Sequence, residues 1–362
     1  MTIRVLHTEW ADGWGGQEIR ILQEMLAMKE AGCDVSIACT SHSNISKYAK
    51  ENAITTYHLP FKGNTDFKTL WGLRKIIKEN KIDIVNTHSG KDTVVGGLAA
   101  KLTGRKFIRT RHLSIPTKKS SLMNKLADYI ITTGESVKEK MISYTGINPN
   151  KIQSITTGID PTRFNPDHYN RETQRAKFNL KDDEIVLGMI AVLRSWKRHD
   201  RLFECAKILI DQGNNIKILL AGDGPNKEAI KNKIKENQLE NRVIMLGHVK
   251  NPEEVLPAVD FVLSCSDGNE GVSQSVMQAL LMSKAVLATN VGSVKDLYHN
   301  DNFILTENGA VTDWAASLKN LIDHPEKKKA YEKKARDYVL DNFSKEVMVK
   351  KIMAIYQKLL AV

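Results

Sequence analysis

A carboxylate stands directly before a helix start near residue 270, where a buried strand turns into a helix. Residues 261–265 are apolar and β-prone, and residues 272–282 carry apolar side chains at helical spacing. Free amides at a helix start attract phosphate, and Glu270 can accept hydrogen bonds from neutral hydroxyls. A phosphate joined to a sugar suits both groups. The plainer alternative is that Glu270 only stabilises the helix dipole.

Cations follow another predicted strand, in the stretch 192–199. Arg194, Lys197 and Arg198 could clamp a diphosphate there and stabilise the charge that develops on its leaving group. Solvated surface cations are the alternative. The sequence of this loop thus predicts either an anion-binding site or a solvated group of cations.

Histidines and tight turns end several other predicted strands. The turns at 222–225 and 247–249 are better explained by simple chain reversal than by a ligand. His88 and His112 end strands of the first half, and one of them could meet a substrate, although a lone histidine is more often structural.

Common cofactor sites find no match in the sequence. The glycines at 15–16 precede a helix, but the GxGxxG spacing of a dinucleotide site is missing, and residues 90–93 only imitate the end of a P-loop. No Asp-x-Asp pair offers a divalent cation its ligands, and the four cysteines show no metal-ligand spacing. We therefore expect no metal and no cofactor, with the cysteines reduced and packed in the core.

The chain has 362 residues and a net charge of +11, most of it in residues 1–163. This length favours two domains, and no apolar run is long enough to span a bilayer. The start lacks the order of a signal peptide, so we expect a cytosolic protein, either free or peripheral on the inner membrane. No acidic residue lies between Asp92 and Asp128, whereas many cations do. Those assigned to an acceptor or membrane patch are Arg105, Lys106, Arg109, Arg111, Lys118 and Lys119.

Two kinds of anionic partner suit that basic patch. An anionic acceptor or an anionic membrane surface would suit it, and a solvated face is the alternative. Nucleic acid is disfavoured because only Phe107 is interleaved with the cations.

Short β-prone runs alternate with amphipathic helical segments along the whole chain, which predicts an α/β protein with two doubly wound parallel sheets. The alternation pauses in a polar stretch with two prolines. We predict a first domain over 1–165, a linker over 166–183, a second domain over 184–342, and an amphipathic helix over 343–362 that returns to the first domain.

In this order the motifs resemble the family 4 glycosyltransferases, retaining enzymes of the GT-B fold, in which two Rossmann-like domains face each other across a cleft. The resemblance covers nearly the whole chain. It rests on Gly15-Gly16, His112, Gly158-Ile159-Asp160, the Lys197 loop, Gly222-Asp223-Gly224-Pro225, Gly247-His248-Val249, Glu270-Gly271-Val272-Ser273 and the stretch 291–296.

The resemblance implies that the second domain binds a nucleotide sugar, expected to be UDP-linked, and that the first binds the acceptor. His112, Lys197 and Glu270 would be the catalytic residues. The residues implied to bind the donor are Gly15, Gly16, Arg194, Lys197, Gly222, His248, Val249, Glu270, Gly271, Val272, Ser273 and Gln278.

Three positions depart from the family's usual pattern. Gln278 replaces the second glutamate of a pair, Val192 stands where arginine is usual, and Arg198 follows the lysine in place of glycine. The role of the missing arginine passes to Arg194 in this interpretation. Gln278 can still hydrogen-bond a ribose hydroxyl, but without charge.

The resemblance implies metal-independent, retaining transfer of a sugar to a saccharide acceptor, in lipopolysaccharide or other surface-glycan assembly at the inner membrane face. A sugar-nucleotide epimerase of the same fold is one alternative. A degenerate saccharide- or nucleotide-binding module is the other, and it would follow from the changes at Val192 and Gln278.

Overall fold

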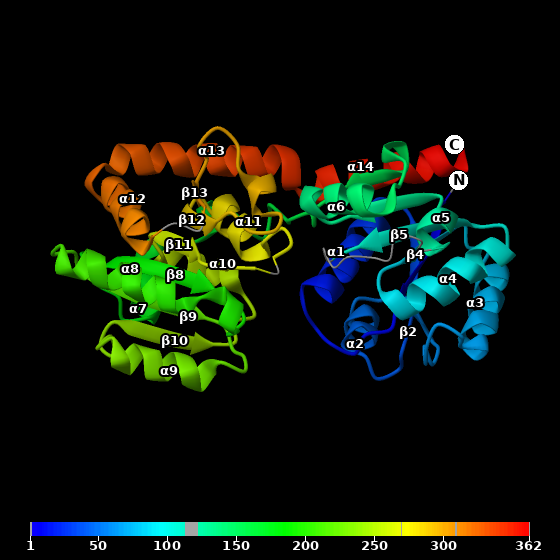
Figure 1. The fold of residues 1–362 in the computed structure, drawn as a ribbon, viewed down its shortest axis with the longest axis horizontal. Helices are drawn as coiled ribbons and strands as arrows, with labels where there is room; N and C mark the ends of the chain where they lie inside the picture. Colours follow the sequence, from blue (N-terminus) through cyan, green and yellow to red (C-terminus); the bar gives the residue numbers. More distant parts are fainter. Residues whose placement is uncertain (1, 113–121, 269, 308–309, 362) are drawn as a thin grey trace. The chain divides into compact units, whose positions relative to one another are not determined.

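The computed structural model describes residues 2–112, 122–268, 270–307 and 310–361. The chain forms two compact units (Figure 1). The first comprises residues 1–158 together with 345–362, and the second comprises residues 159–344.

The first unit is built on a seven-stranded parallel sheet in the order β3-β2-β1-β4-β5-β6-β7. Its strands are short runs rich in Val, Ile and Thr, which suit a sheet buried on both faces. They are β1 (Arg4–Glu9), β2 (Asp34–Cys39), β3 (Thr55–His58), β4 (Ile84–Thr87), β5 (Lys106–Arg111), β6 (Tyr129–Thr132) and β7 (Ile152–Ser154).

Helices cover both faces of this sheet. Buried side chains of α1 (Gly16–Glu30), α2 (Asn44–Glu51) and α14 (Lys345–Leu360) share one core with the strands. The opposite core is shared with α3 (Phe67–Glu79), α4 (Gly90–Leu102), α5 (Leu122–Leu126) and α6 (Glu135–Thr145). The short helix η1 (Pro149–Lys151) leads into β7.

The second unit has a six-stranded parallel sheet in the order β10-β9-β8-β11-β12-β13. Its strands are β8 (Ile185–Ile190), β9 (Ile216–Ala221), β10 (Val243–Gly247), β11 (Phe261–Ser264), β12 (Ala285–Thr289) and β13 (Ile304–Thr306).

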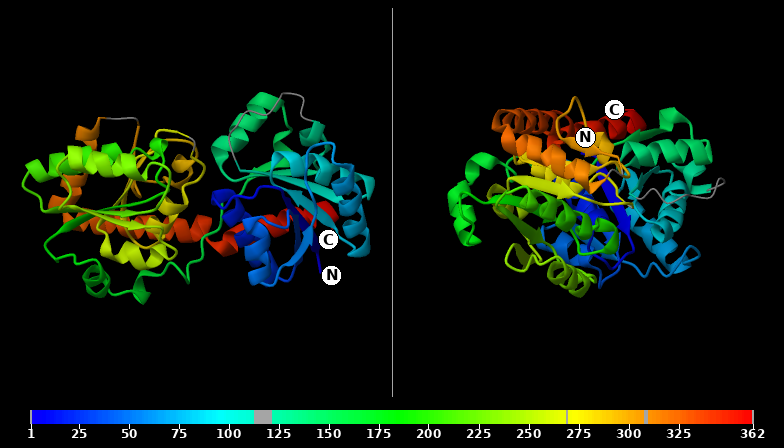
Figure 2. Two further views of the ribbon diagram at one scale, coloured as in Figure 1. Left: turned by 90° about the horizontal axis from the view of Figure 1, so that it is seen from below. Right: turned by 60° about the vertical axis from the view of Figure 1, so that its left-hand side comes forward.

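The second sheet is also covered on both faces (Figure 2). One core includes buried side chains of α8 (His199–Asp211), α9 (Lys227–Glu236) and α12 (Val311–Asp323). The other includes α10 (Pro252–Val255), α11 (Gln274–Leu281) and α13 (Pro325–Phe343). The remaining elements are η2 (Pro166–His168), α7 (Arg171–Lys177), η3 (Ser195–Lys197), η4 (Leu256–Ala258) and η5 (Val294–Leu297).

Each sheet has one point at which the chain reverses its direction of winding. In the first unit β1 lies between β2 and β4, and in the second unit β8 lies between β9 and β11. Ligands of doubly wound sheets bind beyond the carboxyl ends of the strands at such a switch point. The loops after β1, β4, β8 and β11 therefore lie where doubly wound sheets bind their ligands.

The two parallel-sheet units confirm the predicted fold class, but the expected linker over 166–183 is structured. It contains η2 and α7 and lies in the second unit. The guanidinium of Arg175 is buried there, donates to the Ala258 carbonyl at 3.2 Å and pairs with Asp260 at 3.2 Å. These contacts fix a segment whose polar composition suggested a free connection.

The C-terminal helix begins later than expected, at Lys345, because Phe343 ends α13 and Ser344 interrupts the two helices. α14 belongs to the first unit. No helix among the described residues is both long and apolar enough to cross a membrane.

Candidate active site

An ion pair joins the two loops at the switch point of the second unit. Lys197, in η3 after β8, donates from Nζ to Oε1 of Glu270, which follows β11. Ser266 Oγ donates to the same carboxylate oxygen at 2.6 Å. The two charged side chains are only 17% and 10% exposed. The structure thus brings together the two residues on which the sequence interpretation most depends.

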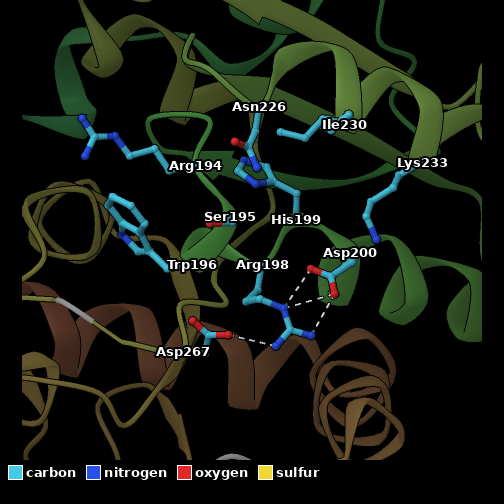
Figure 3. A pocket seen from close by; sticks show the side chains of 11 residues that line it. Arg194, Ser195, Trp196, Arg198, His199, Asp200, Asn226, Ile230, Lys233 and Asp267 are labelled. Carbon is cyan, nitrogen blue, oxygen red and sulfur yellow. Dashed lines mark hydrogen bonds and ion pairs between the residues drawn. The ribbon is translucent and has the colours of Figure 1, made fainter.

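Arg198 ties the same loops together from a second side (Figure 3). Its guanidinium binds Asp200 at 2.8 Å and Asp267 at 3.0 Å. Hydrogen bonds to Asp200 and then Asp267 raise the pKa of Arg198 above its ordinary value, so it stays charged. The backbone N–H of Asp267 also donates to the Trp196 carbonyl at 3.0 Å. Side-chain and backbone contacts together hold the two loops in register.

A cavity of about 490 Å³ opens beside the η3 loop. Arg194 is on its wall, exposed, with its guanidinium over the Trp196 ring at 4.9 Å (Figure 3). Lys197 does not line this cavity. The structure therefore gives the Arg194 guanidinium an aromatic partner, and the Arg194 carbonyl accepts from the Lys197 backbone N–H at 3.1 Å. The cavity is lined by Arg194, Ser195, Trp196, Arg198, His199, Asp200, Asn226, Ala229, Ile230, Lys233 and Asp267.

Two glycines allow backbones to meet closely at this edge. A Cβ on Gly292, after β12, would lie 1.8 Å from the carbonyl oxygen of Glu270, and Gly292 has a φ of +60°. A Cβ on Gly222, after β9, would lie 1.8 Å from the Ala191 carbonyl oxygen, with φ at +153°. Only glycine fits such contacts in these conformations. Gly222 thus allows the loop after β9 to pack closely against the backbone at Ala191, and Gly292 allows the loop after β12 to pack against the backbone of Glu270.

The predicted donor-binding residues that follow Glu270 lie just before α11 and within it. Gly271, Val272 and Ser273 lead into α11, and Ser273 is its N-cap. Ser273 does not cap the helix with its side chain, since its Oγ lies 3.2 Å from Ser275 Oγ. Helix-start amides are therefore available to an anion. Gln278 is half-buried within α11.

Beyond β10, His248 is exposed, and Val249 packs against the core of the second unit. Backbone contacts to a base remain the role predicted for this turn.

In the first unit, a buried carboxylate organises the loop after β1. Glu9 Oε1 accepts from the backbone amides of Trp10 and Ala11 at 2.8 and 2.9 Å, and Oε2 accepts from Gln17 Nε2 at 2.6 Å. Ser89 Oγ, at the start of α4, donates at 2.6 Å. Gly15 is the N-cap of α1, and Gly16 begins the helix. Glu9 thus links the glycine turn to the β4 loop, a role that sequence spacing did not suggest.

A second buried carboxylate lies next to Glu9. Asp92 accepts from Thr8 Oγ1 at 2.8 Å and from the backbone N–H of His88 at 2.9 Å. Burial raises the pKa of Asp92 to about 6. Burial, and then the charge of Asp92, raise the pKa of Glu9 to about 7, although its hydrogen-bond donors act in the opposite direction. The loop after β1 is therefore attached to a group that titrates near neutral pH.

His112 lies directly after β5, buried, as the outer member of a row of three histidines. His7 Nδ1 lies 2.9 Å from His88 Nε2, and His88 Nδ1 lies 3.1 Å from His112 Nε2. Burial, and then the charge of Arg20, lower the pKa of His7 and of His112 to about 3. Burial also lowers the pKa of His88 well below its ordinary value. All three rings are therefore neutral at physiological pH.

The predicted basic patch is not one exposed surface. Arg109 points into the protein, is 6% exposed and donates to Asn124, so it is a buried residue and not part of a docking face. Arg105, Lys106 and Arg111 are half-buried. Lys118 and Lys119 lie outside the described residues. β5 is buried on both faces from Phe107 to Thr110, so Arg109 lies inside, which proximity in sequence did not reveal.

The four cysteines are free and buried, as predicted. Across the described part of the chain, no group of three or more His, Cys, Asp or Glu side chains has the geometry to hold a metal ion.

Two family models cover most of this chain. Residues 170–338 match the model described as glycosyl transferases group 1, and residues 14–163 match that of glycosyltransferase family 4. The chain belongs to the family 4 glycosyltransferases. The Lys197–Glu270 pair lies within the region that matches the first of these two models.

Two curated glycosyltransferases align with this chain over most of their length. The chain is 23% identical over 355 residues to a Staphylococcus aureus capsular polysaccharide biosynthesis glycosyltransferase, CapM, with 92% of each chain covered. It is 25% identical over 334 residues to an Escherichia coli UDP-Gal:alpha-D-GlcNAc-diphosphoundecaprenol alpha-1,3-galactosyltransferase, with 84% of each chain covered.

Solved structures share the GT-B fold. A glycosyltransferase from Rickettsia africae matches with a TM-score of 0.91 at 23% identity, covering 99% of both chains. HepE from Anabaena, solved in complex with UDP and glucose, matches with a TM-score of 0.81 at 18% identity, covering 98% of this chain and 100% of that one.

The departures from the family 4 pattern have distinct structural settings. Arg198, where glycine is usual, has φ at +52°, the left-handed region that glycine adopts without cost. Val192, where arginine is usual, is 51% exposed. The first departure preserves the backbone conformation while adding a cation, and the second removes a cation from the surface of the loop.

Proposed function

We propose that this glycosyltransferase moves a sugar from a UDP-linked donor to a saccharide acceptor of a surface glycan, with retention of anomeric configuration. The observation that carries the proposal is the Lys197–Glu270 ion pair at the switch point of the second unit. The pair places the Lys197 ammonium beside the Glu270 carboxylate, close to the start of α11. A nucleotide sugar can bind all three groups: its diphosphate suits Lys197 and the helix-start amides, and its sugar hydroxyls can donate to Glu270.

The charges suggest how such a donor is held. Lys197 exchanges part of its contact with Glu270 for the diphosphate, and amides at the start of α11 contribute further positive potential. Glu270 keeps its bond from Ser266 and accepts from sugar hydroxyls. Glu270 is already oriented, so less conformational freedom is lost on binding. Gln278 faces the ribose in this proposal.

The reaction needs no metal or separate cofactor in this proposal. Lys197 and the α11 amides supply the positive charge that stabilises the leaving diphosphate. The leaving phosphate helps to deprotonate the acceptor on the same face of the sugar, which gives retention. His112 lies by the reacting sugar, and the first unit binds the acceptor.

The names of relatives support the donor and acceptor classes. CapM is named for capsular polysaccharide biosynthesis, and the Escherichia coli relative is named for galactosyl transfer from UDP-Gal. HepE was solved with UDP and glucose. Lipopolysaccharide is one surface glycan that fits this class.

The first test is a thermal-shift screen with UDP, GDP, ADP, CMP and their common sugar conjugates, because selective ligands stabilise the folded state by mass action. We expect a shift with UDP and its conjugates. Transfer assays with the selected donor then identify the acceptor, and NMR of the product reports the anomer. Turnover of the donor without an acceptor would instead indicate an epimerase, and no shift with any nucleotide would favour a binding module.

We also propose that the first unit contacts an anionic membrane through α3. Phe67 and Trp71, four residues apart on the helix, are 70% and 60% exposed. The Arg74 guanidinium lies over the Trp71 ring at 4.2 Å, and Lys75 and Lys78 are exposed on the same helix. Aromatic rings beside cations suit the interface of an anionic bilayer. These five side chains are called the α3 surface below.

A further inference from the structure

Three buried rings form a continuous row at the switch point of the first unit. His7 lies in β1, His88 follows β4 and His112 follows β5. The inner two rings are parallel, with an interplanar angle of 7° and centroids 5.2 Å apart. Three imidazoles have six nitrogens, and the two ring-to-ring contacts use four of them. The nitrogens left over are His7 Nε2 at the inner end and His112 Nδ1 at the outer end.

The inner end is sealed inside the protein. His7 is 0% exposed, and its Nε2 has no hydrogen-bond partner among the described residues. The nearby Arg20 is also buried, paired with Glu24 at 3.0 Å. Its positive charge lowers the pKa of all three rings. On His7 Nε2, a proton would be a buried donor without an acceptor among the described residues.

Hydrogen bonding along the row links the three tautomers. A neutral imidazole has one N–H and one lone pair, so each contact needs a donor on one side and an acceptor on the other. If His7 Nε2 carries the lone pair, His7 Nδ1 donates to His88, and His88 Nδ1 donates to His112 Nε2. His112 must then carry its proton on Nδ1. The reverse arrangement would put the proton on His7 Nε2, where no described residue accepts it.

We propose that His7 and His88 are positioning residues that hold His112 in its Nδ1–H tautomer, so that His112 meets the substrate as a hydrogen-bond donor. This role at the substrate rests on the proposed function, whereas the tautomer itself does not. The orientation of the row is set at its inner end, where His7 Nε2 is buried without a partner among the described residues.

The row also excludes one chemical role for His112. A general base must accept a proton near the working pH. Burial and the charge of Arg20 hold the pKa of His112 at about 3, and its Nε2 is already engaged by His88. His112 therefore donates to an oxygen of the sugar or phosphate and leaves deprotonation of the acceptor to another group.

The test is NMR of protein labelled with ¹⁵N at histidine, in which the two neutral tautomers give different nitrogen shifts and couplings. The His112 signals are assigned from their loss in His112→Gln. We expect the Nδ1–H pattern in the native protein. His88→Phe removes the donor and should give a mixture of tautomers, whereas His88→Gln can still donate an amide proton and should restore the Nδ1–H pattern.

Two further variants guard the experiment. His58→Phe, which removes a histidine hydrogen-bonded to Ser46 at 2.9 Å in the same unit, should leave the His112 pattern unchanged. If His88→Phe does not fold, His7→Phe tests the same row from its inner end and should also mix the tautomers. A native His112 that carries its proton on Nε2, or is charged at neutral pH, overturns the proposal.

Activity measurements separate this inference from the proposed function. With the donor found by screening, His88→Phe should lower kcat by about twofold to fivefold and change the donor KM little, because only a fraction of the molecules keeps the Nδ1–H form that stabilises the transition state. His88→Gln should recover much of that loss. An Nδ1–H pattern in a protein that transfers no sugar would leave the row intact and reject the proposed function. A lost pattern with unchanged kcat would reject the role of the row at the substrate.

Discussion

Lys197 and Glu270 form a pair whose partners would each be left with an unmatched, mostly buried charge if the other were removed. We predict that Lys197→Ala and Glu270→Ala each lower turnover by roughly a hundredfold or more, the usual effect of losing an electrostatic partner of the transition state. Steady-state kinetics with the screened donor provide the measurement.

Lys231→Ala is the matched control for the lysine. This residue pairs with Glu228 at 2.8 Å on the surface of α9, in the same unit, and its removal should leave kcat/KM unchanged. Near-normal rates for both Lys197→Ala and Glu270→Ala would show that the chemistry lies elsewhere.

Arg198 combines an unfavourable backbone conformation with favourable side-chain contacts. Its φ of +52° disfavours any side chain, whereas its guanidinium binds Asp200 and Asp267. Arg198→Gly and Arg198→Ala lose the same contacts, but only alanine keeps the backbone cost. We predict that the glycine variant is the more stable of the two by about 1 kcal/mol, measured by denaturant unfolding.

Both Arg198 variants should raise the donor KM, because the loops of Lys197 and Glu270 lose a tie at Asp267. Equal stability of the two variants would contradict the left-handed conformation. An unchanged KM would show that the backbone bond from Asp267 to Trp196 suffices to align the loops.

At the scale of elements, Glu9 joins β1, the start of α1 and the start of α4, so its ionisation affects all three. Its pKa is raised to about 7 from 4.5, so folding favours the protonated form. The stability that protonation gives is present at low pH and is lost as the pH rises through 7. Relative to Glu9→Gln, the native protein should therefore lose roughly 1–3 kcal/mol of unfolding free energy between about pH 5 and about pH 8.

Urea unfolding of both proteins at the two pH values provides this measurement. Glu51→Gln, which changes an exposed glutamate of α2, is the control and should follow the native protein at each pH. A constant difference between native protein and Glu9→Gln would mean that the donors around Glu9 keep it ionised throughout.

Short apolar runs predicted nearly every strand, because a β-branched run between two turns is typical of a buried strand. They missed β13, which is only three residues long. The Lys197–Glu270 pair was predictable because both residues follow strands at ligand-facing ends. The row of histidines was not, because it depends on β1 lying beside β4 and β4 beside β5, and a sequence does not state which strands are neighbours.

At the scale of the whole molecule, the α3 surface predicts binding to anionic vesicles. Replacing Phe67 and Trp71 together by serine should weaken binding to phosphatidylserine-containing vesicles by roughly tenfold or more, because two exposed rings that would insert into the bilayer are lost. Co-sedimentation at low and high salt provides the measurement, with weaker binding expected at high salt.

Tyr144→Ser is a suitable control, since Tyr144 is 52% exposed on α6 of the same unit, and its removal should leave vesicle binding unchanged. Equal binding to neutral and anionic vesicles would reject the membrane proposal and leave the cations of α3 as a solvated face.

The placement of α14 has a consequence for protein synthesis. Its buried side chains Met348, Ile352, Ile355 and Tyr356 complete the core formed by α1 and the first sheet. The ribosome makes them only after the entire second unit, although the rest of that core is among the earliest residues to emerge. Domains generally fold in the order in which they are made. Here the second unit can fold first. Until α14 is made, the first unit has an uncovered apolar face that chaperones would recognise.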